Sequence, residues 1–321
     1  MTVATGERIQ GAVFGAAVGD ALGFPVEFVK SLDEIRAKHG PAGVTGYVRY
    51  WERGDRRFAP YSDDTQMAEL VLRTLVWQRK RGADLDTTMR HLATYFVLWC
   101  YKPVGGHRAP GNSCMAGCRA LYSGVPWNEA GAEDAGGCGS VMRVYPVALA
   151  FAADPEKAEQ WALAQSSLTH RAPIAFAACA AMTRGLIEVL KGADVGQVLE
   201  TMQAAATRHD AGTGAMIRDA VRSAGDSEAP ECVLERLKGW AAHEAIAAAA
   251  FVFARHPDSP REALLEAVNS PGDSDSIGTL VGALSGARCG LAALPEPWRL
   301  DLERSAELGA LAAEAASLFA P

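Results

Sequence analysis

The chain has 321 residues, which is enough for one large domain with a sizeable core. Hydrophobic residues make up 49% and charged residues 21%, a balance that excludes disordered and collagen-like chains. The formal net charge of −7 excludes a strongly basic nucleic-acid binder with a broad surface for polyanions.

Apolar residues spaced three or four positions apart, in an alanine-rich background, predict helices along most of the chain. Period-two alternation is nearly absent, so no sheet is expected. Glycine and proline mark loops at 102–112, 130–140, 224–230 and 269–274. We therefore predict one compact, orthogonal, multi-helix all-α domain over residues 1–321. The predicted helices cover 7–22, 65–79, 87–101, 155–166, 173–190, 195–208, 240–255, 277–294 and 300–319.

Cellular context is indicated by three features. The N-terminus has no basic region that leads into a cleavable apolar segment, so we expect no signal peptide. The apolar run 245–254 is about half as long as the roughly 20 residues that a membrane span needs. The seven cysteines are odd in number and contain no Cys-x-x-Cys, which favours reduced thiols over disulfides or zinc. We expect a cytoplasmic protein without membrane contact.

The first chemical motif spans residues 15–28, which are rich in glycine and place Asp20 and Glu27 in apolar company. One interpretation is a close-packed helix end with a glycine cap. The other is a functional carboxylate, because apolar surroundings shift the pKa of a group such as Glu27.

The second motif is an acidic helix start at Ser62, Asp63 and Asp64. Ser62 or Asp63 can cap the helix that follows, and an acid is favourable at a helix N-terminus. Capping needs only one acid, however. Two adjacent carboxylates flanked by hydroxyls supply the hard oxygen ligands that Mg²⁺ or Mn²⁺ requires.

Two further segments offer polar groups for an anionic ligand. Gly137 and Gly139 belong to a small-residue loop that continues through Ser140 and Met142 into a helical segment. Such a loop lets backbone N–H groups approach a phosphate, although a plain turn has the same composition. His170 directly precedes the helix predicted from residue 173, where it is either an ordinary helix-start residue or a hydrogen-bond partner for a sugar or phosphate.

A second acidic helix start lies at Asp273, Asp275 and Ser276. Capping alone accounts for an isolated Asp-x-Asp, and the later ligands of an EF-hand are missing. If this helix start converges with Asp63 and Asp64, four carboxylates meet. They cannot remain ionised together without cations, and two divalent ions would neutralise them.

These five landmarks, in this order, resemble the ADP-ribosylglycohydrolase family over residues 11 to about 290. The resemblance implies an all-α fold with a binuclear Mg²⁺ or Mn²⁺ centre in a cleft. It implies a catalytic role for Glu27 and a supporting place for Asp20 in the substrate site. The implied metal ligands are Ser62, Asp63, Asp64, Asp273, Asp275 and Ser276. The implied contacts to ADP-ribose are Gly137, Gly139, Ser140, Met142 and His170.

The activity implied by the resemblance is hydrolysis of the C1″ bond between ADP-ribose and an acceptor, either a protein side chain or a small adduct, by a monomeric enzyme. Ala109 stands where the arginine-specific bacterial enzyme has an aspartate, which disfavours an arginine linkage. Two alternatives stay open. One is a non-catalytic ADP-ribose-binding or interaction protein, and the other is a metal-dependent nucleotide phosphohydrolase.

Overall fold

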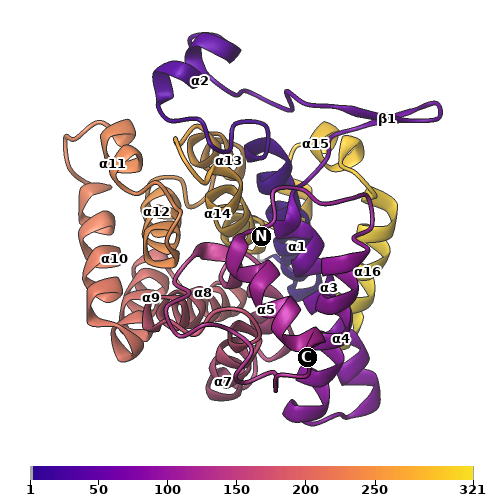
Figure 1. The fold of residues 1–321 in the computed structure, drawn as a ribbon. Coiled ribbons are helices and arrows are strands. Elements are labelled where there is room, and N and C mark those ends of the chain that lie inside the picture. The colour runs from indigo at the N-terminus through magenta and orange to yellow at the C-terminus, as the bar shows by residue number, and fades with distance from the viewer. Residues whose placement is uncertain (1–2, 321) are drawn as a thin grey trace.

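A computed structural model describes residues 3–320, and helices dominate that part of the chain, as the sequence predicts (Figure 1). Two short strands form an antiparallel hairpin in which Trp51 pairs with Phe58. The helices are α1 (Thr5–Gly23), α2 (Leu32–His39), α3 (Asp63–Arg81), α4 (Leu85–Tyr101), α5 (Asn112–Tyr122), α6 (Tyr145–Ala150), α7 (Pro155–Ser167), α8 (Pro173–Lys191), α9 (Val195–His209), α10 (Ala211–Ser223), α11 (Pro230–Arg236), α12 (Ala242–Arg255), α13 (Pro260–Val268), α14 (Ser274–Cys289), α15 (Glu296–Asp301) and α16 (Ser305–Phe319), with 3₁₀ turns η1 (Cys138–Ser140) and η2 (Leu291–Ala293) and strands β1 (Trp51–Arg53) and β2 (Arg56–Phe58).

Seven of the predicted helices are present with ends shifted by a few residues, and two are interrupted. The helix predicted over 277–294 ends at Cys289, because Gly290 turns into a positive-φ conformation (φ 83°). The helix predicted over 300–319 is split into α15 and α16. The split occurs because the Glu303 N–H donates to the Ala59 carbonyl at 2.9 Å and Arg304 adopts a left-handed conformation.

Sequence patterns missed the shorter helices α2, α5, α6, α10, α11 and α13 and the hairpin β1–β2. The hairpin residues are mostly exposed on both faces, so they carry no alternation of buried and exposed positions. Figure 1 shows the hairpin projecting from the helical body.

Among residues 3–320, α1 and α14 make the most extensive contact between any two helices, in the middle of the helical body (Figure 1). A Cβ atom added to Gly15 would lie 2.0 Å from the carbonyl oxygen of Gly282, so the two backbones touch. Glycines recur every fourth residue on both helices, at Gly11, Gly15 and Gly19 and at Gly278, Gly282 and Gly286. This spacing lines one helix face with glycine and lets the axes approach closely. The crossing brings the end of α1 next to the start of α14.

α8 is the helix within residues 3–320 that is long and apolar enough to cross a membrane. Of its most apolar window, 72% is buried within the protein, where α7, α9 and α12 pack against it. α8 is therefore a core helix here. The apolar run 245–254 lies in α12 and is buried apart from Ala254.

Candidate active site

A cavity of about 460 Å³ opens between the starts of α3 and α14. Its walls come from segments far apart in the sequence, as expected for a site assembled by helix packing. Nine of the thirteen residues predicted for the site line it, and Asp20, Ser62, Ser140 and Asp275 do not. The full lining consists of Glu27, Phe28, Asp63, Asp64, residues 109–114 and 137–139, Met142, His170, Trp240, Asp273 and Ser276.

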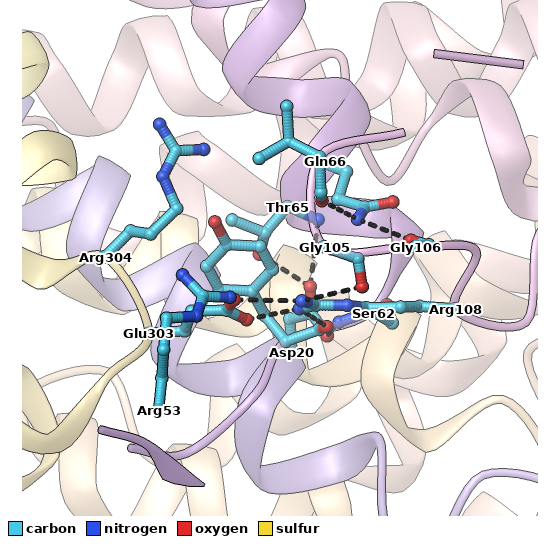
Figure 2. Close-up of polar contacts among 12 residues, drawn as sticks. Asp20, Arg53, Ser62, Thr65, Gln66, Gly105, Gly106, Arg108, Glu303 and Arg304 are labelled. Atoms are coloured by element: carbon cyan, nitrogen blue, oxygen red, sulfur yellow. Dashed lines mark hydrogen bonds and ion pairs between the residues drawn. The ribbon is translucent and has the colours of Figure 1, made fainter. Parts of the chain in front are cut away.

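The start of α3 is held from below by Asp20. One carboxylate oxygen of Asp20 accepts a hydrogen bond from the Ser62 N–H at 2.7 Å. The other oxygen accepts from the Thr65 N–H at 2.9 Å and from the Thr65 hydroxyl at 2.5 Å (Figure 2). Ser62 caps the helix by accepting from the Asp64 N–H at 3.2 Å. These bonds orient Asp63 and Asp64, which are 4% and 3% exposed, toward the cavity.

A side-chain hydrogen bond connects the start of α14 to the start of α3. The Ser276 hydroxyl donates to Asp64 Oδ2 at 2.9 Å, across 212 residues of sequence. Asp275 accepts from the Ser276 N–H at 3.0 Å, and Asp273 lies at the N-cap position of α14. The two acidic helix starts therefore converge in one place.

Glu27 completes this acidic cluster from the loop after α1. One oxygen each of Glu27, Asp273 and Asp275 lie within 4.8 Å of one another. Glu27 Oε2 is buried without a hydrogen-bond partner among the described residues. Burial, followed by the charges of Asp275 and Asp273, raises the pKa of Glu27 to about 11.

The pKa values of the neighbouring carboxyl groups are also raised by burial and by nearby negative charges. Burial, followed by the charge of Asp275, raises the pKa of Asp20 to about 7 and raises the pKa values of Asp63, Asp64 and Asp273 well above their usual range. Like charges at these distances in a desolvated site require compensating positive charge to stay ionised. The orphaned Glu27 oxygen and the carboxylate-rich donor set fit divalent cations that prefer hard oxygen ligands.

Sequence reasoning missed a thiol in the same cluster. Cys138 Sγ donates to Asp273 Oδ2 at 2.7 Å, and the same sulfur lies 3.4 Å from the Ser276 hydroxyl oxygen. Its place in the glycine loop was visible in the sequence, but nothing there indicated that the loop would face Asp273.

Two residues predicted as substrate contacts do not line the cavity. Asp20 is fully buried and holds the α3 start, so it is a positioning residue. Ser140 is also fully buried. Its hydroxyl accepts from the Ser166 hydroxyl at 2.8 Å, because the 3₁₀ turn η1 rotates it into the core. Gly137, Gly139 and Met142 of the same segment do line the cavity.

His170 is held by a buried arginine. Arg143 donates to Thr169 Oγ1 at 2.7 Å, and that oxygen lies 2.7 Å from His170 Nδ1. Among residues 3–320 the Thr169 hydroxyl has no acceptor other than His170, so we assign its proton to the bond with Nδ1. Burial, followed by the Arg143 charge, lowers the pKa of His170 to about 3. His170 is thus a neutral imidazole with its proton on Nε2.

An aromatic pair stands at the cavity mouth. The rings of Phe28 and Trp240 stack at 5.2 Å between centroids, and their residues are 60% and 40% exposed. Phe28 has a left-handed backbone (φ 68°), and its N–H donates to the Gly272 carbonyl at 3.0 Å. Phe28 ends the glycine-rich motif 15–28 and Trp240 begins the helix predicted over 240–255, but neither pattern indicated that the two rings would pair, because their pairing depends on contact between distant loops.

The loop that forms one cavity wall is anchored by a buried ion pair. Arg108 pairs with Glu303 (Figure 2). Arg108 also donates to the Tyr61 carbonyl at 2.7 Å. The Arg108 carbonyl accepts from the Asp63 N–H at 3.2 Å, which connects this anchor to the start of α3. Ala109, the next residue, lines the cavity in a left-handed conformation (φ 55°).

The fold and the site together define an all-α protein with a carboxylate-lined cavity between the starts of two helices. The sequence model of the ADP-ribosylglycohydrolase family matches residues 1–321, and the chain belongs to this family. It therefore belongs to a family of hydrolases of ADP-ribosyl linkages.

Several relatives match over most of their length. The ADP-ribosyl-dinitrogen reductase glycohydrolase of Rhodospirillum rubrum is 29% identical over 306 residues, covering 94% of this chain and 92% of the relative. An ADP-ribosylarginine hydrolase of Pseudomonas putida is 28% identical, covering 96% and 77%. Human ADP-ribosylhydrolase ARH3 is 23% identical, covering 95% and 92%. A solved structure described as an ADP-ribosylglycohydrolase-related protein complex superposes with a TM-score of 0.70 at 28% identity, covering 98% of both chains.

Proposed function

We propose that this protein is a Mg²⁺- or Mn²⁺-dependent hydrolase that cleaves the C1″ glycosidic bond between ADP-ribose and its acceptor. The observation that carries the proposal is the convergence of two acidic helix starts with Glu27 in one cavity. Family membership supports the reaction class, and the carboxylate donor set supports the cations.

Two divalent cations would be held by the oxygen ligands of the α3 and α14 starts. When bound, they supply positive charge that orients the ribose hydroxyls and polarises a water molecule. The proposed ligands are Ser62, Asp63, Asp64, Asp273, Asp275 and Ser276.

The chain's own groups then surround a transition state with oxocarbenium character. Glu27 reaches into the cavity with a buried carboxyl and takes or gives the proton at the scissile bond. The segment with Gly137 and Gly139 offers backbone amides to the pyrophosphate. His170 donates from Nε2 to a substrate oxygen without adding charge. Phe28 and Trp240 provide an aromatic wall for the adenine.

The acceptor is a modified protein side chain or a small adduct. Ala109 leaves the cavity wall without a carboxylate at that position, so we propose a linkage other than arginine. We also propose that the enzyme works as a cytoplasmic monomer. Its net charge of −7 suits a single ADP-ribose unit held locally better than a nucleic-acid surface.

The test is a panel of arginine-, serine-, Asp/Glu- and nucleotide-linked ADP-ribose substrates, with and without Mg²⁺ or Mn²⁺. We expect cation-dependent release of ADP-ribose, and at least a hundredfold loss of turnover, on the order of effects for lost electrostatic groups, in Asp64→Asn and Asp273→Asn. The exposed Asp55→Asn is the matched control and keeps full activity.

Each contrary outcome has a definite meaning. Release of AMP or phosphate instead of ADP-ribose identifies a nucleotide phosphohydrolase. Tight ADP-ribose binding in calorimetry without turnover of any substrate identifies a non-catalytic reader. Unchanged turnover in Asp64→Asn rejects the ligand assignment.

A further inference from the structure

A second cavity, of about 380 Å³, lies between α3, the C-terminal part of α4 and the segment before α16. It shares no lining residue with the acidic cavity. Much of its wall is apolar and aromatic, from Leu70, Tyr95, Leu98, Trp99 and Val104. Leu98 is 54% and Val104 69% exposed, so large apolar side chains face solvent together around one hollow. Such clustering is typical of a ligand site, whereas single exposed apolar residues are ordinary.

The polar part of this second cavity is positively charged. Arg73, Lys102 and Arg304 line it against a single acid, Glu69, so the lining carries two uncompensated positive charges. The chain as a whole carries −7. A cationic hollow on an acidic protein favours an anionic occupant by charge complementarity.

The arginines are held in place before any ligand arrives. Glu69 is 8% exposed. Its Oε1 accepts from Arg73 Nη2 at 2.7 Å and Nε at 2.9 Å, and its Oε2 accepts from Arg304 Nη1 at 3.0 Å. A guanidinium has five N–H donors, and Glu69 uses two of those on Arg73. Planar guanidinium groups fixed in this way suit a carboxylate, because little side-chain entropy is lost on binding.

The apolar wall is also preformed. Gln66 accepts from the Trp99 indole N–H at 2.9 Å and donates to the Val104 carbonyl at 2.9 Å and the Gly106 carbonyl at 3.1 Å. Figure 2 shows Gln66 reaching this loop from the first turn of α3. One buried amide therefore ties α4 and the 104–106 loop to α3, which keeps the hollow open.

We propose that this second cavity binds a small aromatic carboxylate. The aromatic body would pack against Tyr95, Leu98 and Trp99, and the carboxylate would face Arg73 and Lys102. The volume lies within the range of about 300–1,000 Å³ that small-molecule sites occupy. This site is separate from the proposed hydrolase reaction and does not depend on it.

The test is calorimetric titration of the full-length protein with 2-naphthoate and with its neutral analogue 2-naphthalenemethanol. We expect saturable binding of one 2-naphthoate with a Kd below about 1 mM, and binding of the alcohol weaker by at least about tenfold. No saturable binding, or equal binding of the two compounds, overturns the proposal.

Variants locate the site. Leu98→Glu puts a carboxylate at the mouth, and Arg73→Gln removes a cation; each is expected to weaken 2-naphthoate binding by at least about tenfold. Leu300→Glu, at a leucine that is 68% exposed outside this cavity, and the exposed Arg81→Gln on α3 are the matched controls and leave binding unchanged. Equal loss in variants and controls, or no loss in Leu98→Glu, refutes the assignment. Leu98→Glu keeps its ADP-ribosyl hydrolysis, so failure here is distinguishable from failure of the proposed function.

Discussion

Gly15→Ala is expected to destabilise the protein although alanine is the better helix former. The new methyl carbon would lie 2.0 Å from the Gly282 carbonyl oxygen and 3.3 Å from the Gly286 Cα. Ordinary contact begins at 3.4 Å, so α1 and α14 must part locally by about 1.4 Å. The obstacle is backbone and cannot rotate away, as a side chain could.

The size of the effect follows from two opposing contributions. Overpacking a tight interior costs about 1–3 kcal/mol, and a backbone obstacle places this site at the upper end or beyond. Alanine regains about 1 kcal/mol of helix propensity. We therefore expect the free energy of unfolding to fall by about 2 kcal/mol or more.

Gly6→Ala in the same helix is the matched control. Its methyl group would meet only the Ala316 Cβ, at 3.9 Å, which is ordinary contact. The substitution is expected to raise the free energy of unfolding by up to about 1 kcal/mol. The same substitution thus has opposite signs at two positions of α1.

Urea denaturation of the metal-free variants, with the slope checked for constancy, measures both effects. A second readout is Mn²⁺ affinity, which should fall for Gly15→Ala because the crossing places the proposed ligands at the start of α14 next to the start of α3, which Asp20 of α1 holds. The reasoning is refuted if Gly15→Ala is as stable as the parent protein or if both alanine variants shift in the same direction.

Three further outcomes are expected. In EDTA, the free energy of unfolding falls as pH rises from about 4 to 7. The reason is that burial raises the pKa of Asp20 from 3.8 to about 7, so in this range the folded protein keeps a proton that the unfolded chain releases. Urea midpoints that rise between pH 4 and 7 would contradict this reasoning. Nitrogen-15 NMR should show His170 neutral, with its proton on Nε2, between about pH 5 and 8, and a charged ring at pH 6 would be inconsistent with its burial. Arg108→Leu should cost about 3 kcal/mol in urea denaturation, at the lower end for a broken buried pair, because Glu303 keeps the exposed Arg53 at 3.6 Å as a partner. The double variant with Glu303→Leu should recover part of this loss; an equal loss in the single and the double variant would argue against a stabilising role of the buried pair.

Helix content and the acidic helix starts could be predicted because both are local properties. Each cap residue directly precedes the helix that it begins, so Ser62 marks the start of α3 and Asp273 marks the start of α14 in the sequence itself. Helix periodicity located the long helices to within a few residues. It failed where tertiary hydrogen bonds decided the outcome, as at Glu303, which bonds to Ala59 and divides α15 from α16.

The roles of several residues could not be predicted from the sequence, because they depend on the direction in which each side chain points in the folded protein. Ser140 stands within a glycine loop that lines the cavity, yet the 3₁₀ turn points it into the core. Cys138, two residues earlier, faces Asp273. Phe28 and Trp240 come from loops with no shared pattern and meet only in the folded chain.

The sequence by itself determined an all-α chain with two carboxylate-rich helix starts and a family pattern, because propensity, capping and motif spacing act over a few residues. Only the tertiary structure decided that the two starts form one site. The hydrogen bond from Ser276 to Asp64 spans 212 residues and exists because the glycine faces of α1 and α14 allow their backbones to touch. In the sequence, the glycines of α1 were interpreted as the end of a helix, whereas in the folded protein they form the surface on which α1 crosses α14.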